Sequence, residues 1–209
     1  MQRGIRAYVR ELHRSARPID DREVDALLGI TEEEERLDPF ELVLEHGNEL
    51  IDAYDGSPYE VAREAVRRLQ PKRTDVLYDL GCGYGRVVLW AALVSEAEVR
   101  GVELVPVRAT LAQHAIRRLR LANARVVQGN VLSTSFDDGN LFFLFDPFFR
   151  QTMERVSRKL ARIARAHPIR IASHWMSNDV FARRRWLREM VDPRDTSDDP
   201  YRLRLFASI

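Results

Sequence analysis

Three glycines on alternate positions, Gly81, Gly83 and Gly85, follow directly on the apolar, β-favouring run Val76–Leu80. An apolar pattern with helical spacing begins at Val87. This order predicts a strand, a tight loop and a helix. Glycine lets the backbone adopt positive φ and lets a ligand approach without a Cβ in the way. In an open α/β sheet such a loop lies at the carboxyl end of a strand, where nucleotides bind.

The residues around the glycines indicate which ligand fits. A dinucleotide fingerprint reads G-x-G-x-x-G, and a phosphate-binding P-loop ends in G-K-[ST]. Here Arg86 occupies the sixth place, and no Gly-Lys-Ser/Thr follows. Asp79, at the strand end, would repel a pyrophosphate but would suit a ligand that carries an ammonium group. S-adenosylmethionine has such a group and no phosphate, so the residues favour it as the cofactor.

The run Asp79-Leu80-Gly81-Cys82-Gly83-Tyr84-Gly85 resembles the first motif, D-x-G-x-G-x-G, of the Rossmann-like (class I) S-adenosylmethionine-dependent methyltransferases, with no departure. The resemblance extends from Tyr54 to about Ser208. The run Tyr78 to Ala92 and the later Gly101-Val102-Glu103 are also similar to the non-SET lysine methyltransferases. The resemblance implies a methyltransferase that uses S-adenosyl-L-methionine.

Further cofactor contacts are expected beyond the glycine loop. Glu103 ends the predicted strand Val99–Glu103, about 20 residues after the glycines, where a carboxylate accepts from both ribose hydroxyls. In the resembled family the place of Asn130 binds the adenine amino group, and an Asn oxygen can accept from it; the neighbouring backbone, here Val131, meets the ring. The predicted cofactor-binding residues are Tyr54, Asp79, Gly81, Cys82, Gly83, Glu103, Asn130 and Val131.

The acceptor site is expected after the most apolar strand, Leu141–Phe145, which is predicted to be central and buried on both faces. It leads into Asp146-Pro147-Phe148-Phe149, which resembles the [D/N]-P-P-[Y/F] signature of methyltransferases acting on planar nitrogen or amide groups. Asp146 is the candidate catalytic residue, which would orient the acceptor nitrogen, with Pro147 and Phe148 as substrate contacts. Phe148 departs from the signature, because the family has a second proline there. An Asp-Pro turn that simply ends a buried strand is the alternative.

Two further residues are candidate substrate contacts. His174 ends the predicted strand Ile169–His174 on the ligand side, as a general base, a substrate contact or a structural histidine. Tyr59 follows a turn that folds over the cofactor pocket in the resembled family, and it is either a ligand contact or a packing residue. Ser57 is predicted to cap the helix after this turn, with Glu60 completing a capping box. Ser177 and Asn178 are the candidates to cap the helix that follows His174.

The segment from Ile5 to about Tyr54 is predicted to be helical and to lie outside the sheet. Asp20 or Asp21 is expected to cap a helix that Gly29 closes, and a second apolar stripe runs over Phe40, Val43, Leu44, Leu50 and Ile51. The glutamates at positions 32–35 are expected to form a solvated face. This N-terminal helical cap either covers a sheet edge or acts as a lid over the substrate site.

Strands that alternate with helices predict an α/β fold without any family knowledge. We expect a Rossmann-like methyltransferase fold with a seven-stranded, mainly parallel sheet and helices on both faces. Residues 1–56 are assigned to the N-terminal helical cap, and residues 57–209 to the S-adenosylmethionine-binding methyltransferase domain. The last two strands, Trp186 to Val191 and Tyr201 to Ala207, are predicted to form an antiparallel hairpin.

The charge, the cysteine count and the apolar runs of the chain limit the partners that can be expected. The formal net charge of +1 gives little field to attract nucleic acid or a membrane surface. Cys82 is the only cysteine, so no cysteine cluster can hold zinc and no intrachain disulfide can form. No metal site is expected. Because no apolar run approaches the roughly 20 residues of a membrane span, a cytoplasmic protein is expected. The oligomeric state is open.

The predicted function is methyl transfer from S-adenosylmethionine to a nitrogen acceptor, with oxygen as the second choice. A protein lysine and a small-molecule amine are both compatible with the sequence. Two alternatives stay open at this stage. The altered motif at Phe148 also suits a non-catalytic protein of methyltransferase fold that binds the cofactor. A nicotinamide-dependent oxidoreductase is disfavoured by Arg86, which stands where the fingerprint needs glycine.

Overall fold

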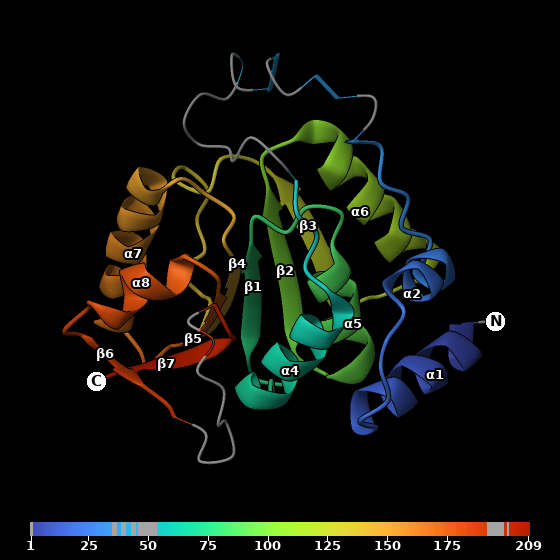
Figure 1. Cartoon of the computed structure of the whole chain (residues 1–209), viewed down its shortest axis with the longest axis horizontal. Helices are drawn as coiled ribbons and strands as arrows, with labels where there is room; N and C mark the ends of the chain where they lie inside the picture. Colours follow the sequence, from blue (N-terminus) through green and yellow to red (C-terminus); the bar gives the residue numbers. More distant parts are fainter. Residues whose placement is uncertain are drawn as a thin grey trace.

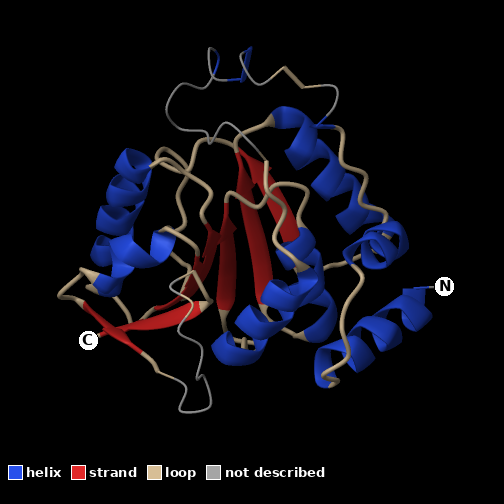
Figure 2. Ribbon diagram, viewed as in Figure 1, coloured by secondary structure: helices blue, strands red, loops and turns tan. Residues whose placement is uncertain are grey.

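The computed structural model describes residues 2–34, 37, 38, 41, 42, 45, 54–191, 199 and 201–209. Within these residues the chain forms a seven-stranded sheet with the order β3-β2-β1-β4-β5-β7-β6, drawn in red in Figure 2. The strands are β1 (Val76–Leu80), β2 (Glu98–Glu103), β3 (Ala124–Gln128), β4 (Leu141–Phe145), β5 (Arg170–His174), β6 (Leu187–Glu189) and β7 (Arg204–Ser208).

The first five strands are parallel, and β7 runs antiparallel between β5 and β6. The predicted mainly parallel sheet and its closing antiparallel hairpin are therefore confirmed. β4 is the middle strand, and four of its five residues are buried. A parallel strand that is covered on both faces has a continuous apolar sequence. The apolar run Leu141–Phe145 therefore allowed the central position of this strand to be predicted.

Helices cover both faces of the sheet, as Figure 1 shows. α4, α5 and α6 lie on one face, with α1 and α2 outside them, and α7 and α8 lie on the other. The helices are α1 (Gln2–Arg14), α2 (Asp21–Leu28), α4 (Tyr59–Leu69), α5 (Arg86–Val94), α6 (Pro106–Arg118), α7 (Arg150–Ala164) and α8 (Ser177–Ala182). The predicted Rossmann-like methyltransferase architecture is confirmed.

The two faces carry separate apolar cores. The core under α4 and α5 contains Trp90 and Tyr59, both fully buried. The opposite core is built around Phe136, Phe142 and Phe181. Burial of such side chains stabilises the fold by about 1.5–3 kcal/mol each. The buried residues of α1 and α2 belong to the first core, so these helices pack on the sheet domain, and the division at residue 56 stays a prediction.

The start of the chain follows the sequence prediction closely. Ile5, Val9 and Leu12 form the buried stripe of α1. Asp20 caps α2 by accepting the backbone N–H groups of residues 22 and 23, and Gly29 ends the helix at φ 74°. The apolar stripe expected from Phe40 onward falls outside the described residues.

Two predicted helix caps are wrong. Ser57 does not cap α4; the helix begins at Tyr59, whose backbone N–H donates to Asp21 Oδ1 at 2.9 Å. A carboxylate from α2 therefore replaces the local serine. Ser177 was expected to cap α8 but lies inside its first turn, and its hydroxyl donates to Asp146 Oδ1 instead.

Of the described glutamates at positions 32–35, Glu32 is exposed as expected, but Glu33 and Glu34 are half-buried. Glu34 accepts from Arg108 through both carboxylate oxygens, and Glu32 Oε1 lies 3.2 Å from Arg86 Nη2. Arg86 also bonds to Asp25 of α2. These pairs attach the N-terminal segment to α5 and α6. These ion pairs could not be predicted from the sequence, because the two partners lie more than 50 residues apart along the chain.

No helix among the described residues has the length and apolar character needed to cross a membrane.

Candidate active site

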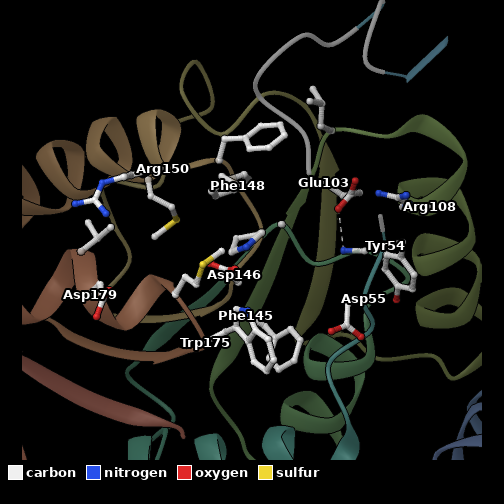
Figure 3. A pocket seen from close by; sticks show the side chains of 18 residues that line it. Tyr54, Asp55, Glu103, Arg108, Phe145, Asp146, Phe148, Arg150, Trp175 and Asp179 are labelled. Atoms are coloured by element: carbon white, nitrogen blue, oxygen red, sulfur yellow. Dashed lines mark hydrogen bonds between the residues drawn. The ribbon is translucent and has the colours of Figure 1, made fainter. Parts of the chain in front are cut away.

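A cavity of about 570 Å³ opens at the carboxyl ends of β1, β2, β4 and β5. Figure 3 shows Tyr54, Glu103 and Arg108 at one end, Arg150 and Asp179 at the other, and Asp146 between them. The first end is formed by the glycine loop and the end of β2, and the second by the segments after β4 and β5. The cavity thus joins the predicted cofactor loop to the predicted acceptor motif.

The glycine loop has the geometry that its sequence predicts. Gly81, Gly83 and Gly85 have φ values of 82°, 51° and 86°, in the left-handed region that favours glycine. A Cβ on Gly81 would lie 2.3 Å from Pro147 Cβ, and one on Gly83 would lie 2.6 Å from Tyr54 Cε2. The absence of side chains therefore lets the acceptor motif and Tyr54 approach the loop.

Glu103 links β2 to the glycine loop. Its Oε2 accepts from the backbone N–H of Gly83 at 2.8 Å, and its Oε1 accepts from Val105 N–H at 2.9 Å. The side chain lines the cavity although the residue is only 4% exposed. Burial raises the pKa of this carboxyl, although the hydrogen bonds from the two backbone N–H groups act to lower it. A carboxylate fixed in this way is a preorganised acceptor for hydroxyl groups.

Asp79 lies at the end of β1, is 3% exposed, and lines a small recess beside the cavity with Tyr54 and Cys82. Burial, and then the charge of Glu103, raise its pKa well above the ordinary value. Within the described part of the chain, nothing donates a hydrogen bond to its carboxylate. Because two buried acids flank the glycine loop, the site suits a ligand with a cation and hydroxyl groups and repels a pyrophosphate.

Cys82 is buried behind the loop, and burial raises the pKa of its thiol well above the usual range. A Cβ on Gly101 of β2 would lie 2.4 Å from its Sγ. The thiol therefore packs against the bare backbone of β2, while the residue also lines the recess.

Tyr54 closes the cofactor end of the cavity. The Arg108 guanidinium lies 4.9 Å from the centre of its ring, and Tyr84 meets it edge-on at 5.1 Å. Arg108 lines the cavity from the first turns of α6. Arg108 is not among the site residues predicted from the sequence, because its position depends on an ion pair with the distant Glu34.

Asp146 follows β4 with φ 43°, a left-handed conformation that is unusual for a residue other than glycine. Its Oδ1 accepts from the Ser177 hydroxyl at 3.2 Å, and burial raises the pKa of the carboxyl. Pro147 and Phe148 line the cavity beside it. The structure thus brings the three predicted acceptor residues together in one wall, and Pro147 lies directly against Gly81 of the glycine loop.

Four predicted site residues lie elsewhere among the described residues. Tyr59 is fully buried, and its hydroxyl donates to Asp25 Oδ1 at 2.9 Å. It packs in the core, so the expected substrate contact is corrected to a packing role. His174 does not line the cavity; its ring stacks on Phe145 with centres 4.8 Å apart. His174 therefore lies behind Phe145, and the structure does not place it where it would contact a substrate directly.

Asn130 and Val131 follow β3 and do not line the cavity. Asn130 Oδ1 accepts from the backbone N–H of Leu132 at 2.8 Å. Lys159 Nζ donates to the carbonyl oxygens of Val131, Leu132 and Thr134 and so fixes this loop from α7. Their predicted adenine contacts stay predictions.

Several lining residues were missed by the sequence analysis. Except for Asp55, which follows Tyr54, they lie at the end of β4 or on the segments that follow β2, β4 and β5. They are Asp55, Leu104, Arg108, Phe145, Phe149, Arg150, Met153, Trp175, Met176, Asp179 and Val180. The residues after β5 were available from the sequence, because Trp175 and Met176 follow a strand that ends on the ligand side.

Residues 77–167 match the sequence model of a family described as "Methyltransferase domain". This span begins in β1 and ends after α7, so it contains the glycine loop, Glu103 and the acceptor motif. No curated protein matches the chain.

Solved structures share the fold. An RNA methyltransferase from Salinibacter ruber, in complex with S-adenosyl-L-homocysteine, is 22% identical with a TM-score of 0.55, over 74% of this chain and 92% of that one. A precorrin 8w decarboxylase from Methanobacterium thermoautotrophicum is 15% identical with a TM-score of 0.54, over 75% and 92%. An rRNA methylase from Streptococcus thermophilus is 12% identical with a TM-score of 0.51, over 75% and 98%.

The strand order and the site at the carboxyl ends of the strands define an α/β protein of the Rossmann-like methyltransferase fold. Residues 77–167 match a methyltransferase domain, and the fold of the chain is that of the class I S-adenosylmethionine-dependent methyltransferases. The buried acids beside the bare glycine loop fit a cationic, phosphate-free ligand such as S-adenosylmethionine.

Proposed function

We propose that the protein methylates a nitrogen acceptor, a small-molecule amine or a protein lysine, held by Asp146. An oxygen acceptor is the second choice. The single observation that carries this proposal is the carboxylate of Asp146, which lines the cavity on a strained backbone beside the glycine loop. Strain of about 1–3 kcal/mol persists at sites where function requires it.

The carboxylate has room for an acceptor. An ionised carboxylate offers about four lone-pair sites, and Ser177 is its donor among the described residues. The remaining sites can accept N–H bonds from a substrate in the cavity. Asp146 thereby directs the nitrogen lone pair toward the cofactor end, and such positioning accounts for most of the catalysis.

The cofactor end is assigned residue by residue. Asp79 would face the methionine ammonium and Glu103 the ribose hydroxyls, with Gly81 and Gly83 allowing close approach. Asn130 would accept from the adenine amino group, with the Val131 backbone on the ring. When bound, S-adenosylmethionine supplies an electrophilic methyl group on its sulfonium, so the protein has to bind, align and exclude water.

Phe148 narrows the acceptor. Where the resembled signature has a second proline, an 8% exposed phenylalanine lines the cavity, and it replaces a rigid backbone element with an apolar ring. The change to phenylalanine favours an amine acceptor over the planar nitrogen or amide groups on which enzymes with the unaltered signature act. Two fold neighbours are named as RNA or rRNA methylating enzymes, so the expectation against a nucleic-acid substrate stays a prediction.

The test is a comparison of Asp146→Asn with Asp179→Asn, which changes another carboxylate of the same cavity. Transfer of labelled methyl from S-adenosylmethionine is measured with a small-amine mixture, a lysine-containing peptide and an RNA as acceptors. We expect Asp146→Asn to lower turnover about 100-fold, with S-adenosylhomocysteine affinity unchanged. Loss of S-adenosylhomocysteine binding in Asp146→Asn would instead make Asp146 a wall of the cofactor pocket. Full turnover in that variant would refute its role.

A further inference from the structure

The outer face of α1 carries arginines that recur every three or four residues and line a shallow groove of about 600 Å³. The groove residues are the arginine stripe, Arg3, Arg6, Arg10 and Arg14, together with Ala7, Glu11 and Ser15. Figure 1 shows α1 on the outside of the molecule. None of the described residues of α1 lines the active-site cavity, so the groove is separate from the candidate active site.

Most guanidinium groups of the arginine stripe have no structural partner. Arg10 Nε donates to the carbonyl of Leu93 at 3.1 Å, which attaches α1 to the end of α5. Within the described part of the chain, the side chains of Arg3, Arg6 and Arg14 form neither a hydrogen bond nor an ion pair. Arg3 and Arg14 are exposed, and Arg6 is half-buried. Contacts within the protein therefore do not account for three of the four charges.

Positive charge is concentrated around this helix. Residues 2–17 contain five arginines and one glutamate, a formal charge of +4, whereas the whole chain carries +1. The glutamate, Glu11, lies 3.5 Å from Arg17 and so is compensated by an arginine outside the stripe. Burial, and then the charges of neighbouring arginines, lower the pKa of His13 to about 4. The low net charge of the chain thus coexists with a strongly positive surface at α1.

The buried face of α1 argues against a membrane as the anionic partner. A helix that binds a membrane surface inserts its apolar face at the boundary between headgroups and acyl chains. Here Ile5, Val9 and Leu12 are at most 6% exposed and belong to the core under α4 and α5. The apolar face of α1 is therefore already occupied by the protein itself.

The groove lining distinguishes a nucleic acid from an acidic protein. Protein–protein interfaces are centred on apolar and aromatic anchors, and among the described lining residues the one apolar side chain is that of Ala7. Nucleic-acid interfaces are polar and strongly basic, and arginine binds a phosphate through two parallel N–H bonds. At about 1.5 Å per residue, Arg3 and Arg14 are about 16 Å apart along the helix axis. That distance corresponds to about five phosphates of one stacked strand.

We propose that the arginine stripe binds the phosphodiester backbone of a nucleic acid. Its guanidinium groups contact successive phosphates. Since no described residue of the groove offers an aromatic ring on which bases could stack, the base sequence is not read. α1 packs on the last turn of α5 through Arg10 and Leu93, whereas the glycine loop precedes the first turn. The inference is therefore independent of the proposed function, and the nucleic acid is a partner held outside the active-site cavity.

The experiment measures the fluorescence anisotropy of a labelled single-stranded RNA of mixed sequence as the full chain is added, over a range of salt concentrations. The stripe variant combines Arg3→Gln, Arg6→Gln and Arg14→Gln. At low salt we expect this variant to bind the RNA roughly tenfold more weakly than the wild type, because three phosphate contacts are lost. Each contact with a single strand contributes about 0.7 to the slope of log affinity against log salt concentration, so the slope should decrease by about 2.

The control variant combines Arg183→Gln, Arg185→Gln and Arg188→Gln. These substitutions remove three exposed arginines outside the groove, so both variants lose the same charge. We expect the control to bind the RNA within roughly threefold of the wild type, because salt screens distant charges. Unchanged melting temperature and S-adenosylhomocysteine affinity in the stripe variant show that it is folded.

Wild-type affinity in the stripe variant, or no binding of the RNA to the wild type, overturns the inference. An equal loss in both variants also overturns it, because net charge alone would then account for the binding. Tighter binding of a polyglutamate peptide or of phosphatidylserine vesicles than of the RNA would assign the groove to an acidic protein or to a membrane and would refute the proposal. Methyl transfer to amines should be equal in the stripe variant and the wild type. Its absence from both would refute the proposed function and leave this inference standing.

Discussion

Both carboxylate oxygens of Glu34 accept from Arg108, each at 2.7 Å. The Tyr84 hydroxyl of the glycine loop donates to the same carboxylate at 2.9 Å. Arg108 in turn lies over the ring of Tyr54 and lines the cavity. The N-terminal segment is therefore connected to the cofactor end of the site through one glutamate.

Glu34→Gln should destabilise the protein. Arg108 is buried, so removal of the charge and of one acceptor oxygen weakens charge-assisted hydrogen bonds that contribute about 2 kcal/mol. For a chain of this size the melting temperature should fall by about 4–8 °C. Glu11→Gln is the matched control, since Glu11 and Arg17 are both largely exposed and such pairs contribute little. Equal melting temperatures in the two variants would show that the Glu34 pair carries no stability.

Asp146→Asn should retain or gain stability although it loses turnover. Asparagine adopts the left-handed region more readily than most residues, and its neutral amide avoids the cost of burying a charge. Burial raises the pKa of Asp146 in the folded state, so the ionised carboxyl destabilises the fold at neutral pH. The gain should vanish as pH falls below the ordinary value of 3.8. Melting curves at both pH values test this, and a large loss of stability at neutral pH would contradict it.

Gly101→Ala should be destabilising by about 1–3 kcal/mol through overpacking. The new Cβ would lie 2.4 Å from Cys82 Sγ and 2.9 Å from Val126 Cγ2. Cys82→Ala should relieve part of this cost, and a double-mutant cycle in urea measures the coupling. Gly4→Ala provides the control, because nothing lies within 4 Å of its Cβ in α1 and alanine favours helix. Strict additivity of the Gly101 and Cys82 changes would disprove the contact.

Cofactor binding should release protons in mildly acidic solution. Burial and Glu103 raise the pKa of Asp79 in the free protein, whereas an ammonium beside it would favour the ionised form. A group with a raised pKa holds its proton above its ordinary range, so affinity should increase as pH rises through that raised value. Calorimetry of S-adenosylhomocysteine in buffers of different ionisation enthalpy counts the protons. The count should fall in Asp79→Asn, and an unchanged count would place the ammonium elsewhere.

Local sequence signals predicted the elements that depend on neighbours along the chain. The glycine loop, the apolar run of β4 and the Asp20 and Gly29 ends of α2 all follow from residues close in sequence. Predictions failed where a distant group competed for the same atom. Asp21, and not Ser57, accepts the hydrogen bond from the backbone N–H of Tyr59. The hydroxyl of Ser177 donates to Asp146 and does not cap its own helix.

The sequence by itself determined the α/β fold and the conformation of the glycine loop, because periodicity and glycine spacing act over short distances. Only the tertiary structure decided which side chains face the cavity. Tyr59 and Trp175 are both large aromatic residues near predicted turns, yet one is fully buried and the other is 44% exposed. The difference arises because strand ends that are far apart in the sequence meet at one edge of the sheet. The packing at that edge decides whether an aromatic side chain is buried in the core or lines the cavity.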